Sequence, residues 1–570
     1  MTNQQTIEGI PQTEKGHVKD RLKKFMGVQR KDATLAKAYM IVSFVSLLLG
    51  ALLGLVQGLN RAGLFELPYW FNYYQVLTSH GLLLVLIFTS FFMIGYFYAG
   101  ISNTLDGLSN GVRKLGWSAF WTKIAGALLA VSQVLIGEAT VLYTFYPPMA
   151  ASVWFYLGLT LIVLGIWQSC FGVFISAAKW RKANKGQRLP ILAFFAVGGF
   201  VLLFFSSLFV AAEVLFMIIP WTLGWVETIN VMVARTLFWA FGHTLVNIWY
   251  LTAVSAWYVI TPKIIDGPRF SDTLTRVVVV LLVVLNIPGG FHHQIVDPGI
   301  SEPIKYMHVY MSLVIGFPSL MTAYAMFYIF EKSGRKKGAK GLFGWFKKLP
   351  WKDARFLALF IAMASFIVGG AGGIAQTMHQ LNQVVHNSLW VVGHFHVTLG
   401  MTAAMTFFGV SYWLIPHISG RQLTPKMNRF AWWTTIVWAI GISIMSLVMH
   451  YVGLLGAPRR TAFTEYMGNA TASSWDPYLL LIAGGATIMT IGIIMQVYTV
   501  FHLMFRAPKG EEEFPIGEAE EGNAIKLPYW TERWSVWILL MWATIAMAYV
   551  VPLVEMMING APGSPPQRTW

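Results

Sequence analysis

The feature that most constrains this chain is a succession of long apolar stretches separated by short polar connections. A helix needs about 20 mainly apolar residues to cross the roughly 30 Å hydrocarbon layer of a membrane. Thirteen stretches have about this length, near 38–59, 74–100, 116–136, 150–178, 190–219, 232–260, 273–289, 304–331, 354–376, 389–416, 430–454, 478–505 and 534–558. Only 12% of the residues are charged, far fewer than in a soluble chain. The sequence therefore predicts an all-α integral membrane protein, a bundle of about thirteen transmembrane helices.

The basic residues are distributed unevenly over the connections. Of the 41 Lys and Arg residues, 34 lie in the N-terminal segment and in every second connection, and five lie in the other connections and the C-terminus. Cytoplasmic loops of membrane proteins are enriched in Lys and Arg. The net charge of +16 therefore indicates membrane topology, with lipid as a partner and no nucleic acid. We predict a multi-pass protein of the cell membrane with a cytoplasmic N-terminus and an external C-terminus.

The same pattern divides the chain into one domain with short ends. We expect a basic cytoplasmic tail at 1–37, a single transmembrane catalytic domain at 38–558 and an external tail at 559–570. The long charged tail and the full-length first apolar stretch argue against a cleavable signal peptide. With Cys170 as its only cysteine, the chain offers no disulfide framework, no thiolate metal site and no CxxCH motif for covalent heme.

Six histidines lie within or beside the apolar stretches: His80, His243, His292, His293, His394 and His396. Polar groups inside a bilayer are costly and are often functional. The predicted topology places five of these histidines toward the external side, and His243 lies deep enough in its helix to reach the same layer. A single histidine would most simply be a hydrogen-bonded core residue, but six in one layer indicate metal binding.

The spacing within each motif predicts how the ligands divide. His394 and His396 lie two residues apart, about 200° around a helix, so they can bind two different groups. His292 and His293 follow a Pro-Gly-Gly sequence, where the backbone can turn both rings toward one point. Together with His243, they can surround one ion. Imidazoles suit copper, iron or zinc, and the lack of thiolates favours an open redox site over a structural zinc.

Four motifs contain these histidines: GHFH at 393–396, FHHQIVDPGI at 291–300, LTSHG at 77–81 and GH at 242–243. Together they resemble subunit I of the heme–copper oxidase superfamily. The sequences GEATVLYTFYPP at 137–148, PSLMTA at 318–323 and APRRTAF at 457–463 resemble its B-type branch, which contains the thermophilic cytochrome c oxidases. The resemblance covers nearly the whole chain and includes the count of thirteen helices.

The resemblance implies two hemes, one low-spin and one high-spin, and one non-heme metal, copper or iron. His80 and His396 would be the axial ligands of the low-spin heme. His394 would bind the high-spin heme. The non-heme metal facing it would be held by the remaining histidines, His243, His292 and His293.

The resemblance also implies roles for charged and polar residues outside the histidine set. Arg459 and Arg460 would pair with heme propionates, although ordinary surface arginines are the alternative. His386 and Asn387 would lie on the propionate side. Because the chain has no covalent heme and no cysteine pair, electrons would come from a second subunit with an external copper domain, supplied by cytochrome c or a quinol.

A cytoplasmic proton route is implied by three hydroxyl residues. Tyr258, Ser319 and Thr322 match positions of the single proton channel of the B-type branch, and Ser319 and Thr322 lie on one helix face. Alternatively, such hydroxyls only bond their own backbone. Glu138 and Glu213 are further acids of the predicted membrane region, and no role follows for them.

The chain departs from the family pattern one turn after His243. Oxygen-reducing members of the branch have a tyrosine there, linked to the histidine, whereas this chain has Asn247. The stretch 271–290 contains no tyrosine, and Tyr250 lies about 10 Å along the helix axis from His243, too far for the same link. We infer that the site lacks its redox-active phenol.

This departure leads to the predicted substrate. Dioxygen cleavage takes four electrons at once, whereas joining two NO molecules to nitrous oxide and water takes two electrons and two protons. We therefore predict a nitric oxide reductase in which Asn247 hydrogen-bonds bound NO or water, or else only fills the space of the tyrosine. The alternative is a B-type terminal cytochrome c oxidase that reduces dioxygen and translocates protons. A transporter without redox chemistry would bind no heme.

Overall fold

The computed structural model describes residues 12–463, 466–517, 529–560 and 562–568, and the regular elements in these ranges are all helical. Twelve helices are long and apolar enough to cross a membrane, or thirteen if one bent pair counts as a single span. Each of the thirteen predicted stretches coincides with one of them. The predicted all-α membrane fold is therefore confirmed.

The spans are built from α-helices that are interrupted in places by short π or 3-10 segments. They are α1 (Gln12–Arg61), α2 (Tyr73–Gly81), η1 (Leu82–Phe88), α3 (Thr89–Thr104), α4 (Asn110–Leu135), α5 (Val153–Ala183), α6 (Ile191–Glu213), η2 (Val214–Ile218), α7 (Ile219–Thr222), α8 (Val231–Val259), α9 (Thr261–Ile264), α10 (Asp272–Leu285), η3 (Ile287–His293), α11 (Glu302–Val314), α12 (Gly316–Lys336), α13 (Ala354–Thr377), α15 (Leu389–Phe395), η5 (His396–Ala404), α16 (Met405–Ser419), α17 (Pro425–Leu454), α18 (Ala470–Ser473), α19 (Asp476–Phe505) and α20 (Trp534–Ile558).

The remaining short helices lie in connections. They are η4 (Gly344–Lys348), α14 (His379–Val385), η6 (Tyr466–Gly468) and η7 (Tyr529–Glu532).

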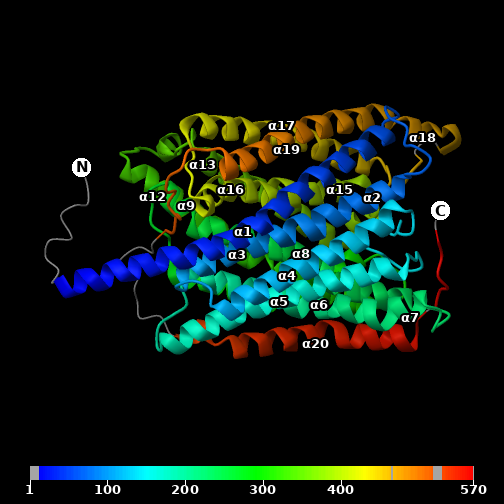
Figure 1. Cartoon of the computed structure of the whole chain (residues 1–570). Coiled ribbons are helices and arrows are strands. Elements are labelled where there is room, and N and C mark those ends of the chain that lie inside the picture. Colours follow the sequence, from blue (N-terminus) through cyan, green and yellow to red (C-terminus); the bar gives the residue numbers. More distant parts are fainter. Residues whose placement is uncertain (1–11, 464–465, 518–528, 561, 569–570) are drawn as a thin grey trace.

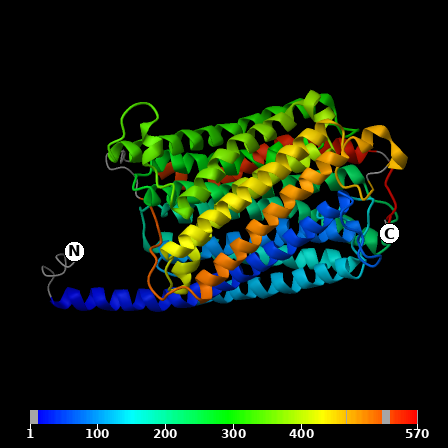
Figure 2. The same ribbon diagram turned by 90° about the horizontal axis from the view of Figure 1, so that it is seen from above.

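The helices run side by side along one direction, with α4 against α5, α6 against α8 and α17 against α19 (Figures 1 and 2). The start of α1 and the C-terminal segment after α20 lie at opposite ends of the bundle in Figure 1. An odd number of spans requires this arrangement. Which end faces the cytoplasm stays a prediction from the distribution of Lys and Arg.

Helix α8 is the central element of the bundle. In the most apolar window of the span Val231–Ile264, 89% of residues are buried, compared with 28% for α20. The span α10–η3 is bent by 57° where α10 ends. Pro288 follows the bend at once and lacks a backbone N–H, which favours a break in the helix. The bend and the central helix together position the histidines described next.

Candidate functional site

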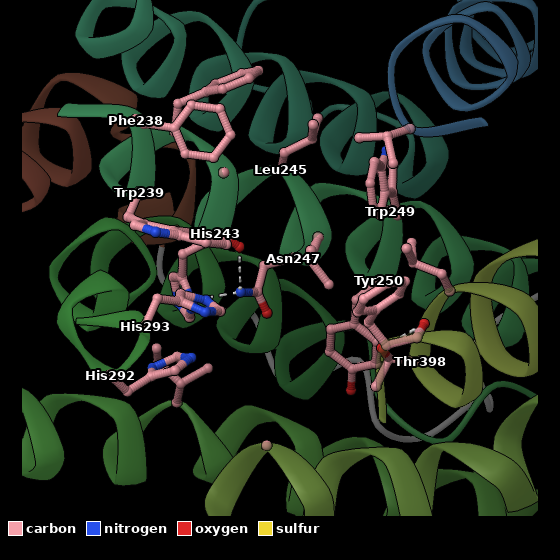
Figure 3. A pocket seen from close by; sticks show the side chains of 18 of the residues that line it. Phe238, Trp239, His243, Leu245, Asn247, Trp249, Tyr250, His292, His293 and Thr398 are labelled. Carbon is pink, nitrogen blue, oxygen red and sulfur yellow. Dashed lines mark hydrogen bonds between the residues drawn. The ribbon is translucent and has the colours of Figure 1, made fainter. Parts of the chain in front are cut away.

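Three histidines from two elements meet inside the bundle. His243 lies on α8 and His292 and His293 lie on η3, with their ligand nitrogens within 4.8 Å of one another. Figure 3 shows the three side chains gathered on one side of a pocket. The structure thus brings together the predicted set of three imidazoles. In the described ranges no carboxylate joins them, and a set of neutral nitrogen ligands suits copper.

The rings of this set are oriented by their surroundings. Nδ1 of His292 lies 2.8 Å from the carbonyl oxygen of Gly289, and the ring of His293 stacks on Trp239 with 3.8 Å between ring centres. A ring nitrogen that donates to a backbone carbonyl leaves the other nitrogen free for a metal. Gly289 allows close packing, because a Cβ there would lie 3.2 Å from Nε2 of His243.

His394 and His396 border different cavities. His394 lines a cavity of about 680 Å³ that the three histidines also line. His396 lines a second cavity of about 190 Å³. Phe395 and Arg459 line both, so the cavities lie on the two sides of a shared wall. This is the arrangement that the two-residue spacing predicts.

Across the smaller cavity, His396 faces His80. Their ring centres lie 6.5 Å apart, and the ring planes differ by 21°. Each Nδ1 lies 2.8 Å from a backbone carbonyl oxygen, that of Gly50 for His80 and that of Val392 for His396. Two metal–nitrogen bonds of about 2 Å, together with half of each ring, span about 6 Å. The pair therefore fits a heme iron held between two histidines.

Glycines of α13 form one wall of the larger cavity. Gly369, Gly370 and Gly373 line it, and a Cβ at Gly372 would lie 2.5 Å from Nδ1 of His394. In the described part of the chain, this nitrogen is buried without a hydrogen-bond partner. A helix surface without side chains allows a flat macrocycle to approach, so the wall fits a second heme bound through His394. These glycines were not among the site residues predicted from the sequence, in which they form the run VGGAGG at 368–373.

The residues predicted to bind heme carboxylates border the cavities. Arg459 lines both cavities and Arg460 lines the smaller one. The side-chain oxygen of Asn387 accepts a hydrogen bond of 2.8 Å from Arg459. An amide leaves the charge of the guanidinium available, and carboxylates are the groups that two neighbouring guanidiniums bind best. The rim therefore fits two heme groups with propionates.

Two charged residues of this rim were not singled out from the sequence. Arg235 on α8 pairs with Asp297 at 3.1 Å, and Asp297 lies 3.9 Å from Nε2 of His386. Burial, followed by the nearby charge of Arg459, lowers the pKa of His386 to about 4. His386 is thus neutral at pH 7. An arginine inside an apolar stretch was the signal that could have identified Arg235.

Asn247 and Tyr250 lie on the same cavity wall. Nδ2 of Asn247 donates to the carbonyl oxygen of His243 at 3.1 Å and lies 3.4 Å from its Nε2. Tyr250 lines the cavity, and its ring stacks on Phe366 with 4.1 Å between centres. Figure 3 shows Asn247 between His243 and Tyr250. Asn247 thus occupies the place next to His243, and the cavity also contains a phenol, that of Tyr250, two turns from His243.

The residues of the predicted proton route lie on two neighbouring helices. The hydroxyl of Tyr258 on α8 donates to Oγ1 of Thr322 on α12 at 3.4 Å. Thr322 also donates to the carbonyl oxygen of Pro318 at 2.8 Å, the backbone bond expected as the alternative. Ser319 lines the larger cavity. The three hydroxyl residues thus lead from the end of α8 toward the cavity.

The placement of Glu138 in the membrane region is wrong. Helix α4 ends at Leu135, and Gly137 then takes a positive φ of 84°, which ends the helical path. The side chain of Glu138 is 40% exposed and pairs with Arg568 at 2.9 Å. Glu213, at the end of α6, is buried as expected for a membrane acid.

Comparisons with known proteins agree with this geometry. Residues 34–488 match the family model described as "Cytochrome C and Quinol oxidase polypeptide I". The chain is 34% identical over 554 residues to cytochrome c oxidase subunit 1 of Thermus thermophilus, covering 95% of this chain and 97% of that protein. It is 23% identical over 452 residues to quinol oxidase subunit 1 of Bacillus spizizenii, covering 76% and 65%. A solved heme–copper terminal oxidase dimer has a TM-score of 0.88 and 31% identity, covering 94% of this chain and 95% of that one.

Proposed function

The chain belongs to the cytochrome c and quinol oxidase polypeptide I family of multi-pass membrane oxidoreductases, and from this premise we propose that it is the catalytic subunit of a terminal oxidase that reduces dioxygen to water. One observation supports the proposal above the others. His243, His292, His293 and His394 line one cavity, and the pair His80 and His396 lines a second cavity behind a shared wall. Electrons that arrive at the pair can thus pass to the larger cavity over a short distance.

Each cofactor has a proposed set of residues. The low-spin heme is assigned to His80 and His396, and the high-spin heme to His394. The non-heme metal, which we take to be copper, is assigned to the three histidines on α8 and η3. Heme propionates are assigned to Arg459 and Arg460, with Asn387 and His386 beside them. When bound, these groups supply the electrons, and the protein orients the ligands and limits water access through the apolar lining of the cavity.

Reduction of nitric oxide to nitrous oxide is the second candidate. The supporting observation is Asn247, which occupies the position of the linked tyrosine and cannot be oxidised as a phenol is. Its amide, directed at the cavity beside His243, can hydrogen-bond a bound gas or water. The names of the relatives, a cytochrome c oxidase and a heme–copper terminal oxidase, support dioxygen more strongly.

The electron source is proposed from the relatives. Cytochrome c oxidases and quinol oxidases both occur among them. We propose cytochrome c as donor, with a second subunit carrying an external copper domain, because the relative that is 34% identical is a cytochrome c oxidase, whereas the quinol oxidase is 23% identical. The external side is taken as the end with few Lys and Arg residues, and it contains the C-terminus.

The purified complex in detergent tests both candidates. Reduced enzyme is given dioxygen or nitric oxide in separate runs, and oxygen consumption and nitrous oxide formation are measured. Rapid oxygen consumption with little nitrous oxide is expected. The reverse result would assign the chain to nitric oxide reduction. An optical spectrum without heme bands would exclude both candidates and favour a transporter.

A further inference from the structure

The face of α8 that borders the larger cavity contains a stripe of three polar residues. His243, Asn247 and Tyr250 are spaced i, i+4 and i+7, which places them on one side of the helix over two turns. All three line the cavity. In Figure 3, the stripe leads from the histidine cluster through Asn247 to Tyr250. At one end of the stripe, His243 belongs to the three-histidine cluster, and at the other end, Tyr250 lies near α12.

The hydroxyl of Tyr250 is free to exchange a proton with neighbouring groups. Tyr250 is 5% exposed, and among the described residues its hydroxyl completes no hydrogen bond. The side chains of Ser319 and Thr322 on α12 lie near this hydroxyl. The ring is held in place by stacking on Phe366 at 4.1 Å and by an edge contact with Trp257 at 5.9 Å. A buried hydroxyl without a fixed partner is unusual and calls for a role.

From Tyr250, hydroxyl side chains form a route to the C-terminal end of α8. Thr322 accepts a hydrogen bond from Tyr258, which lies two residues before Ile260, where α8 is capped. The next cytoplasmic-side position on the α8 face, Val254, is apolar and fully buried. The route therefore crosses from α8 to α12 at Thr322, and Tyr250 is the cavity-lining hydroxyl of α8 at which it can return.

We propose that Tyr250 is the terminal proton donor of the larger cavity. It supplies the protons that the tyrosine replaced by Asn247 would supply. Its O–H bond breaks as the proton passes to a gas-derived oxygen through cavity water. The phenolate then regains a proton from the Ser319 and Thr322 hydroxyls, which are refilled from Tyr258. Only protons move through these residues, and the electrons come from the metal centre. Asn247 and Ser319 line the cavity beside Tyr250 and offer such a water hydrogen-bond partners.

The inference depends on the proposed function only in that the site is reduced and consumes protons. Both candidate reactions do so, with four protons for each dioxygen and two for each pair of nitric oxide molecules. Reduction of a buried centre also draws protons in without any gas, because an added electron is costly in a medium of low dielectric constant. Proton uptake on reduction therefore tests Tyr250 separately from the identity of the substrate.

The experiment uses the purified complex in vesicles. A photoexcited ruthenium dye reduces the hemes, and a pH-sensitive dye on the side that contains the end of α8 follows proton uptake. We expect Tyr250→Phe, which keeps the ring stack on Phe366, to slow uptake at least about 10-fold while the heme spectrum stays unchanged. The matched control is Tyr324→Phe, which alters a 61% exposed tyrosine on α12 and should leave the rate unchanged.

A second variant tests the proposal even if Tyr250→Phe assembles poorly. Site-specific replacement of Tyr250 by 3,5-difluorotyrosine keeps the ring and the hydroxyl but makes the phenol more acidic, so it should change the rate of uptake. Wild-type rates in both variants would overturn the proposal. If uptake slows as expected but neither gas is consumed by the wild type, the proposed function fails and the role of Tyr250 stands.

Discussion

The side-chain amide of Asn247 contacts His243 twice, with a 3.1 Å hydrogen bond to its carbonyl oxygen and a 3.4 Å approach to its ring nitrogen Nε2. This amide therefore holds one of the three metal-binding histidines and also borders the cavity. A side chain in such a position influences which gas reacts without being a metal ligand itself.

Replacing Asn247 by leucine should reduce nitric oxide turnover more than dioxygen turnover. Leucine has a similar volume but no donor, so an interaction with bound NO is lost, and a loss of about 10-fold is expected for one buried hydrogen bond to a reacting group. Metal and heme contents should stay at wild-type levels. Val246→Ala, which changes an apolar residue of the same cavity, is the control. Equal losses for the two gases would show that Asn247 only fills space.

The histidine assignments predict separate losses of cofactors. His80→Ala should lower the heme content from two to one per chain and remove the low-spin spectrum, because the other side of the iron would have only His396. His243→Ala should keep both hemes and lose the non-heme metal, since two imidazoles rarely hold a transition metal tightly. Heme extraction and metal analysis measure both. Loss of copper in His80→Ala with both hemes retained would contradict the assignment.

Gly372 is expected to be important for the second heme, and Gly484 on α19, away from the cavity, provides the control. A Cβ at Gly372 would lie 2.5 Å from Nδ1 of His394, so alanine must displace that ring, whereas a Cβ at Gly484 has no contact within 4 Å. We expect Gly372→Ala to lower turnover by about 10-fold, equivalent to about 1.4 kcal/mol, and to alter the high-spin heme spectrum. Gly484→Ala should behave like the wild type. Similar spectra for the two variants would argue against His394 as a heme ligand.

The spans and the histidine set were predictable from the sequence because both depend on simple periodicities. Thirteen apolar stretches follow from the thickness of a membrane, and the opposite faces of His394 and His396 follow from the geometry of one helix. The contacts of Tyr250 could not be predicted from such a periodicity. Its place on α8 follows from helix geometry, but its contact with the cavity depends on α12 and α13, which are distant in the sequence.

Two other features also depend on contacts between segments that are distant in the sequence. The pairing of Arg235 with Asp297 joins α8 to the segment after η3, and no local pattern predicts it. Glu138 lies two residues beyond the predicted stretch that ends at 136, and its exposed pairing with Arg568 depends on the distant C-terminal segment. Local patterns thus define helices and ligand types, whereas cavity walls depend on tertiary packing.

His386 should make the protein less stable in acid. Unfolded histidine titrates near pH 6.5, while burial lowers the pKa of folded His386 to about 4. Between these values the unfolded chain binds a proton that the folded chain does not bind. The contribution of this group is therefore intact above pH 6.5 and falls as the pH drops, by about 2 kcal/mol at pH 5. His386→Gln should lose less thermal stability than the wild type between pH 7 and pH 5, measured by circular dichroism. Parallel losses would contradict the neutral state of His386.

Thr322 accepts a hydrogen bond from Tyr258 on α8 and lies near Tyr250, so its loss should interrupt proton uptake from the end of α8. Thr322→Val keeps the volume and removes the Oγ1 that accepts the 3.4 Å hydrogen bond from Tyr258. We expect turnover to fall about 10-fold and charge movement across vesicles to slow in parallel, while heme and metal contents stay unchanged. Thr487→Val is the matched control, because Thr487 on α19 bonds only the carbonyl of Ala483 among the described hydrogen bonds. If Thr322→Val and Thr487→Val turn over alike, protons reach the cavity by another route, and the hydroxyl pair of α8 and α12 serves only to pack the two helices.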